Sequence, residues 1–170
     1  MRVGSLFSGI GGLDCGLARA GFEHAFLCES DEWRRGILRE RFPGVPIYED
    51  VRTFGRDQLP GIRGGRGADV AEHERDKLNG AVDLLCGGFP CQDVSVAGRR
   101  EGLAGERSGL FFEFARVAES LRPRWLLVEN VPGLLSSQGG RDFGSVLGTL
   151  AELGYGLAWR VLDARFFGVP

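Results

Sequence analysis

The sequence is poor in several features that mark well-defined classes of protein. It has four cysteines and two histidines, and no Cys-x-x-Cys pair, which argues against a zinc site or a disulfide framework. No run approaches the ~20 apolar residues of a membrane span, and the start MRVGSLFSGIGG lacks the apolar core of a signal peptide. We therefore expect a cytoplasmic protein with reduced cysteines, without a metal and without a membrane partner.

A net positive charge is also lacking. The net charge is −2, so no global basic surface indicates nucleic acid. Of the 21 basic residues only Lys77 is a lysine, and we attribute this arginine bias mainly to a GC-rich genome. The composition, 43% hydrophobic and 26% charged, is typical of a globular domain and excludes disorder. A length of 170 residues predicts one domain, spanning residues 1–170.

Apolar segments alternate with segments of helical periodicity along the chain. We predict strands at residues 2–7, 24–29, 45–48, 82–86, 124–131 and 155–164. We predict helices at residues 12–20, 31–42, 108–121 and 143–154, and a long surface loop at residues 52–80. Such alternation favours an α/β fold with a doubly wound, mostly parallel sheet.

Polar residues and glycines follow the predicted strands at the points where the strands end. The turn SGIGG follows the first strand, Glu29 ends the second, Asp50 follows the third, GGFPC follows the fourth and Glu129 with Asn130 ends the fifth. The carboxyl ends of parallel strands share one edge, where α/β sheets bind their ligands. We therefore expect these positions to converge on one site.

The turn with Gly9, Gly11 and Gly12 precedes a helix and lets a ligand approach the backbone. It matches neither GxGxxG nor a phosphate-binding loop, so alone it fits a tight turn as well as a ligand site. Glu29, at the next strand end, can accept both hydroxyls of a ribose. Together they favour a nucleoside cofactor without pyrophosphate, and S-adenosylmethionine is the obvious candidate.

Cys91 follows a glycine-led loop on the same edge, while the other three cysteines lie within predicted helices or strands and fit core packing. A nucleophilic cysteine needs exposure and positive potential, which downstream arginines can supply. Glu129 ends an apolar strand that we expect to be buried. Burial would raise its pKa and suit it to act as a general acid, although it could instead be a structural carboxylate that caps the next segment.

Five segments, in order, resemble the successive motifs of the DNA cytosine-5 methyltransferases: FSGIGGLDCGLARAGF, ESDEW, GGFPCQDVSVAG, ERSGLFFE and VENVPGLL. The likeness covers essentially the whole chain. It implies a Rossmann-like, S-adenosylmethionine-dependent domain that moves a methyl group to C5 of cytosine through a covalent Cys91 adduct, with Glu129 at the ring N3. It also implies DNA methylation of the restriction-modification type.

The resemblance assigns further roles by position. The implied cofactor-binding residues are Phe7, Gly9, Gly11, Gly12, Glu29, Ser30, Asp50, Val51, Gly88, Pro90 and Leu110. The implied substrate-binding residues are Gln92, Ser95, Gly98, Arg100, Asn130 and Val131. The implied substrate is duplex DNA with the target cytosine flipped out of the stack, since a stacked base hides C6.

The sequence also departs from the family's pattern, because it stops at ARFFGVP, within what resembles a late motif. The target-recognition region and the segment that returns to complete the cofactor pocket are absent. We therefore expect a truncated catalytic domain. Two alternatives stay open: a silent S-adenosylmethionine-binding fragment that needs a separate C-terminal recognition chain, and a tRNA cytosine methyltransferase of the same architecture.

Overall fold

The computed structural model describes residues 1–54, 82–90 and 109–168. These residues form a five-stranded sheet in the order β3-β2-β1-β4-β5, and all four strand pairings are parallel. The strands are β1 (Arg2–Leu6), β2 (Glu23–Cys28), β3 (Ile47–Tyr48), β4 (Leu84–Gly87) and β5 (Trp125–Val128). The predicted doubly wound parallel sheet is therefore confirmed.

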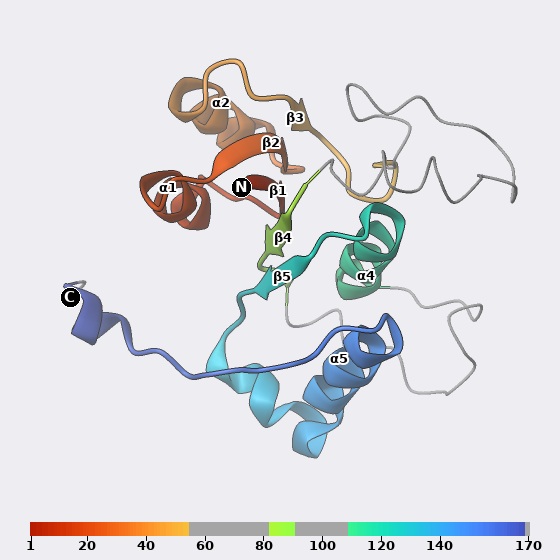
Figure 1. The fold of residues 1–170 in the computed structure, drawn as a ribbon. Helices are drawn as coiled ribbons and strands as arrows, with labels where there is room; N and C mark the ends of the chain where they lie inside the picture. The colour runs from red at the N-terminus through yellow and green to blue at the C-terminus, as the bar shows by residue number, and fades with distance from the viewer. Residues whose placement is uncertain (55–81, 91–108, 169–170) are drawn as a thin grey trace, which may run out of the picture.

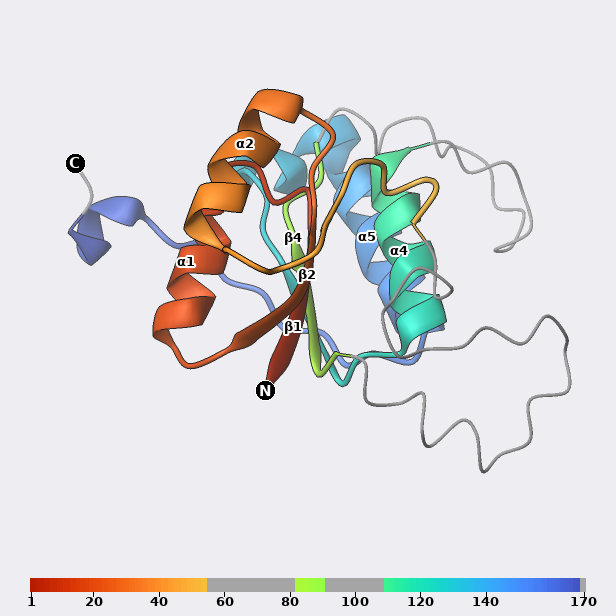
Figure 2. The ribbon, with the colours of Figure 1, turned by 90° about the horizontal axis from the view of Figure 1, so that it is seen from above.

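Helices cover both faces of the sheet (Figures 1 and 2). On one face lie α1 (Gly12–Arg19) and α2 (Glu32–Arg41), and on the other lie α4 (Leu110–Leu121) and α5 (Arg141–Glu152). Three short 3-10 helices complete the described elements: η3 (Pro132–Leu135), η4 (Ser137–Gly140) and η5 (Ala164–Phe167). Each of the four predicted α-helices is present.

The core has a larger part between the sheet and α4 with α5, and two smaller parts under α1 and α2. Phe26, Phe54, Phe111 and Phe114 are fully buried in the larger part. Strand residues alternate between the two faces, so that Val3, Leu84 and Cys86 meet Leu17 of α1 while Leu27 meets Leu38 of α2. Burial on both faces explains the apolar character of β1, β2 and β4.

Strand β5 is at one edge of the described sheet and is covered on one face only. Leu126 and Val128 pack against the larger core, whereas Trp125 is 55% exposed and Leu127 is 39% exposed. The expectation that Glu129 is buried at the end of this strand is wrong, because its side chain is exposed. An apolar run alone does not reveal whether both faces of a strand are covered.

The predicted strand at residues 155–164 is also wrong. The segment pairs with no strand among the described residues, and it runs past the body of the fold to the C-terminus (Figure 1). Its large apolar side chains, Leu157, Trp159, Val161 and Leu162, are between 37% and 64% exposed. A strand needs a neighbour to satisfy its backbone groups, and without one the local pattern does not produce a strand.

Candidate functional site

The carboxyl ends of the strands meet at one edge, as the sequence predicts. Backbone hydrogen bonds join the segments that follow: Ser8 N–H donates to the Cys28 carbonyl (3.0 Å), and Glu129 N–H donates to the Gly87 carbonyl (3.1 Å). The loops after β1, β2, β4 and β5 are therefore fixed relative to one another by parallel pairing that extends just past the strands.

The turn after β1 is built from left-handed backbone. Gly9 (φ 57°) and Gly11 (φ 84°) adopt this conformation without a Cβ, whereas Phe7 (φ 55°) adopts it at a cost in strain. Gly11 is the N-cap of α1 and has no side chain to satisfy the first N–H groups of the helix. A strained residue next to a close-approach turn is typical of a ligand site.

Glu29 holds this turn to the end of β2. Its carboxylate is 6% exposed and accepts the Gly9 N–H at Oε2 (2.8 Å) and the Asp31 N–H at Oε1 (3.0 Å). Arg34 Nη1 lies 3.8 Å from Oε1. Each carboxylate oxygen has two lone pairs, so both oxygens keep capacity for a further donor such as a hydroxyl.

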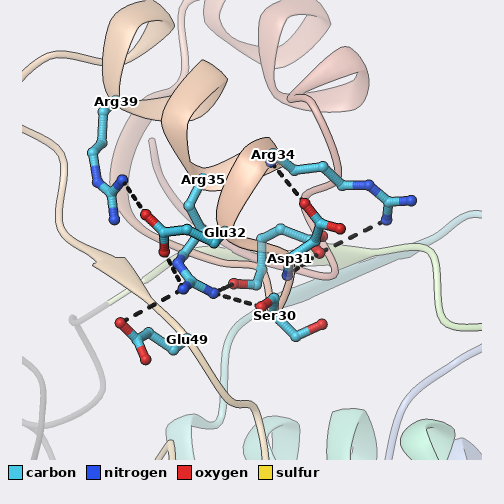
Figure 3. Close-up of polar contacts among 8 residues, drawn as sticks. Ser30, Asp31, Glu32, Arg34, Arg35, Arg39 and Glu49 are labelled. Atoms are coloured by element: carbon cyan, nitrogen blue, oxygen red, sulfur yellow. Dashed lines mark hydrogen bonds and ion pairs between the residues drawn. The ribbon is translucent and has the colours of Figure 1, made fainter.

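Arg35 of α2 binds the backbone at the end of β2, and Figure 3 shows it among Ser30, Glu32 and Glu49. Its side chain is buried, and Nη1 donates to the carbonyls of Glu29 (3.0 Å) and Ser30 (2.6 Å). Nη2 pairs with Glu32 and lies 3.7 Å from Glu49. The guanidinium therefore fixes the chain at the point where β2 ends and places positive charge beneath it.

Arg39 completes the ion-pair network on α2, where Nη1 donates to Glu32 (2.9 Å). The hydrogen bonds from Arg39, and then from Arg35, lower the pKa of the Glu32 carboxyl. Sequence reasoning missed Arg35, since four arginines in this helix look like a solvated face. Helical spacing could have found it, because Arg35, Leu38 and Phe42 lie three and four residues apart on the buried face.

Four more of the predicted cofactor residues differ in how far they are buried. Ser30 is exposed, Asp50 and Leu110 are half-buried, and Val51 is buried. The backbone N–H of Arg52 donates to the Asp50 carboxylate (2.9 Å), and this bond lowers the pKa of Asp50. The Val51 carbonyl accepts a hydrogen bond from Arg116 of α4 (2.7 Å), which ties this loop to the core helix.

The two glycines at the end of β4 are explained by their neighbours. A Cβ at Gly87 would lie 2.5 Å from the Leu6 carbonyl oxygen, and one at Gly88 would lie 2.6 Å from Oε2 of Glu129. Asn130 Nδ2 also donates to the Phe89 carbonyl (2.8 Å), while its Oδ1 accepts the Val131 N–H (2.9 Å). Glycine thus allows the end of β4 to lie close to β1 on one side and to the residue that follows β5 on the other. Pro90 and Val131 are exposed beside them.

A cavity of about 240 Å³ opens where β1, β4 and β5 end. It brings Phe7, Gly88 and Glu129 together, as expected. It also includes residues that sequence reasoning did not single out, and the described residues that line it are Ser5, Leu6, Phe7, Ser8, Leu13, Asp14, Gly87, Gly88 and Glu129. The predicted residues Cys91, Gln92, Ser95, Gly98 and Arg100 lie outside the described residues.

The three described cysteines are free thiols. Burial raises the pKa of Cys28 and of Cys86 to about 12, so both stay protonated and inert near neutral pH. Cys15 is half-buried and packs beside α2. Over residues 1–54, 82–90 and 109–168, no cluster of His, Cys, Asp or Glu could hold a metal ion, and no helix is long and apolar enough to cross a membrane.

Comparison with known proteins identifies the family. The profile described as C-5 cytosine-specific DNA methylase matches residues 1–170. The chain is 40% identical over 174 residues to the Type II methyltransferase M2.BsuMI of Bacillus subtilis, covering 100% of this chain and 39% of that protein. It is 37% identical to the Type II methyltransferase M.Eco47II of Escherichia coli, covering 97% of this chain and 36% of that protein.

A solved structure gives the same fold. The S. pombe Dnmt2 methyltransferase superposes with a TM-score of 0.67 at 21% identity, over 100% of this chain and 47% of that one. The chain spans about two fifths of the length of the curated relatives it matches. Those relatives are methyltransferases, which require a methyl donor. The chain belongs to the C-5 cytosine-specific DNA methylase family.

Proposed function

We propose that this chain is the catalytic part of a DNA cytosine-5 methyltransferase that uses S-adenosylmethionine. The observation that carries the proposal is the cavity that joins Phe7, Gly88 and Glu129 at the sheet edge next to the glycine turn and Glu29. Glycines, a strained turn and a buried acid suit a nucleoside with two hydroxyls. Glu129 is exposed and lies against Gly88, three residues before Cys91 in the sequence, and an acid in this place suits chemistry on a base.

The described residues fit the proposed methyl donor. Glu29 would accept the ribose hydroxyls through the free lone pairs of its two oxygens, and Arg35 would hold that acid in place. A Cβ at Gly9 would have no neighbour within 4 Å, so a ligand can approach the backbone of the turn there, whereas Gly11 is buried against Leu38 and Phe42. When bound, S-adenosylmethionine supplies an electrophilic methyl group on a sulfonium.

The chain's own groups would then activate the cytosine. The Cys91 thiolate would bond to C6, the electrons of the C5–C6 double bond would shift to the C4–C5 bond, and those of the C4–N3 bond would shift to N3, where the protonated Glu129 carboxyl donates its proton. C5 is then nucleophilic and can accept a methyl group, and the sulfonium of the donor would be left as a neutral thioether. Loss of the C5 proton to a base, expulsion of the Cys91 sulfur and return of the N3 proton restore the double bond, so that a methyl group has replaced hydrogen at C5.

Exposure of Glu129 bears on this chemistry. An exposed carboxylate at the mouth of a cavity can meet a base that enters from outside, as a flipped cytosine must. We propose that Asn130 fixes the loop after β5 through its bond to the Phe89 carbonyl and that Val131 borders the entering base. The loop residues Gln92, Ser95, Gly98 and Arg100 would contact DNA.

The experiment is a tritium-transfer assay with labelled S-adenosylmethionine and mixed-sequence duplex DNA. Wild type, Cys91→Ser and the control Cys15→Ser are compared, together with equilibrium dialysis of the cofactor. We expect cofactor binding by all three, and label in DNA with wild type and Cys15→Ser alone. Label transfer by Cys91→Ser would refute the mechanism. In a parallel reaction with tRNA in place of DNA, label in tRNA but not in DNA would refute the proposed substrate. Binding without any transfer would favour a fragment that needs a separate recognition chain.

A further inference from the structure

The cavity at the ends of β1, β4 and β5 has an acidic lining. Two carboxylates, Asp14 and Glu129, and two serine hydroxyls line it together with apolar groups and backbone, and among the described residues no lysine or arginine belongs to the lining. Because a low-dielectric cavity strengthens electrostatic attraction, such a lining favours a ligand with positive charge. The proposed cytosine chemistry uses Glu129 but leaves Asp14 without a role.

Asp14 is a buried acid with an incomplete set of partners. It lies in the first turn of α1 and is fully buried. Its Oδ1 lies 3.2 Å from His24 Nε2, whereas its Oδ2 accepts no hydrogen bond from any described residue. A buried carboxylate oxygen without a donor is costly, since it has lost its water and gained nothing in return. A donor from a ligand in the cavity would remove this cost.

The sheet order indicates which part of a ligand reaches this place. Strands lie in the order β3-β2-β1-β4-β5, with Glu29 at the end of β2 and Asp50 just after β3. A nucleoside with its ribose on Glu29 and its base toward β3 extends its 5′ substituent the other way, toward β1 and β4. The cavity with Asp14 opens on that side. In S-adenosylmethionine that substituent ends in an amino acid.

We propose that Asp14 binds the α-ammonium group of the methyl donor's amino-acid end. This inference rests on the proposed function. The ammonium supplies the hydrogen-bond donor that Oδ2 lacks, and its positive charge strengthens the bond. His24 contacts Oδ1 and so orients the carboxylate. Ser5 and Ser8, whose hydroxyls lie 3.0 Å apart on the same cavity, can reorient to the neighbouring polar atoms of the ligand.

The test compares two nucleosides by isothermal titration calorimetry. S-adenosylhomocysteine carries the amino-acid end, and 5′-methylthioadenosine has the same base and ribose without it. For Asp14→Asn we expect the Kd of S-adenosylhomocysteine to rise by about tenfold to a hundredfold, the usual range for one hydrogen bond to a charged group, while the Kd of methylthioadenosine stays unchanged. Equal effects on both nucleosides, or no effect on either, would overturn the proposal.

Asp142→Asn is the matched control. Asp142 is 4% exposed and pairs with Ser137 at the start of α5, away from the cavity. The same loss of a buried charge there should leave both Kd values as in wild type. If wild type binds neither nucleoside, the proposed function itself fails; if wild type binds both and Asp14→Asn changes neither, only the ammonium site fails.

A second measurement does not depend on the folding of the variant. Wild type is titrated with the desamino analogue of S-adenosylhomocysteine, which keeps the carboxylate and lacks the ammonium. We expect it to bind about tenfold or more weakly than S-adenosylhomocysteine. Equal affinity of the two ligands for wild type would refute the assignment of Asp14.

Discussion

Gly87→Ala should destabilise the fold although it adds only one methyl group. The new Cβ would lie 2.5 Å from the Leu6 carbonyl oxygen, whereas ordinary contacts are 3.4–4 Å. Both groups belong to paired strands, β4 and β1, so the two backbones would have to separate by close to an ångström. Overpacking of this kind costs about 1–3 kcal/mol, and reduced freedom of the unfolded chain returns about 0.4–1 kcal/mol.

Gly88→Ala is the matched control, since its Cβ would lie 2.6 Å from Glu129 Oε2, at the far end of an exposed side chain. That carboxylate can move aside, so we expect stability within about 0.5 kcal/mol of wild type but lower methyl transfer, because Glu129 is displaced. Urea unfolding should be followed by circular dichroism rather than by tryptophan fluorescence. All three tryptophans are more than half exposed in the folded protein, so their fluorescence would change little on unfolding.

The net loss of about 1.3 kcal/mol lowers the urea midpoint of Gly87→Ala by about 0.7 M. An unchanged midpoint for Gly87→Ala would refute the close approach of β1 and β4 that positions the cavity. A midpoint for Gly88→Ala that fell as far as that of Gly87→Ala would refute the distinction between a backbone neighbour and a movable carboxylate.

Two further predictions concern the supports of the site. Arg35→Gln should weaken binding of both S-adenosylhomocysteine and methylthioadenosine by about tenfold, because the Glu29 and Ser30 carbonyls lose their guanidinium donor. Arg39→Gln, which removes a contact with Glu32 only in this network, should leave both Kd values unchanged. Equal effects of the two variants would contradict the role of Arg35. The free energy of unfolding should fall as pH rises above 9. Burial raises the pKa of Cys28 and of Cys86 from 9.0 to about 12, so these thiols ionise in the unfolded chain at a lower pH than in the folded protein. Between the two pKa values each thiol lowers the free energy of unfolding by up to about 1.4 kcal/mol per pH unit. Urea midpoints at pH 8 and pH 10 would measure this loss, and a Cys28→Ser, Cys86→Ser double variant that lost as much between these pH values would contradict the assignment.

The sheet and its site edge were predictable because local pattern and topology agree here. Apolar strands of four to six residues alternate with helices of clear periodicity, and parallel topology then brings the strand ends together. Glycine pairs such as Gly87 and Gly88 signalled a close approach before the approaching groups, Leu6 and Glu129, were known.

What the sequence could not predict depends on neighbours distant in the chain. The run at residues 125–128 is apolar at every position, so its pattern does not show that only Leu126 and Val128 are covered. Residues 155–164 have the character of a strand, but a strand forms only beside another strand, and none of the described strands lies there. Arg35 and Asp14 become significant only when their burial and their partners are known.

The most direct test of the account is covalent capture of Cys91 by a modified base. Duplex DNA containing 5-fluorocytosine is incubated with the chain and S-adenosylmethionine, and the products are analysed by intact mass spectrometry; fluorine at C5 blocks the final elimination. We predict a stable protein–DNA adduct with wild type and Cys15→Ser that peptide mapping places on Cys91, and no adduct with Cys91→Ser. An adduct on another cysteine, or one that persists in Cys91→Ser, would contradict the account.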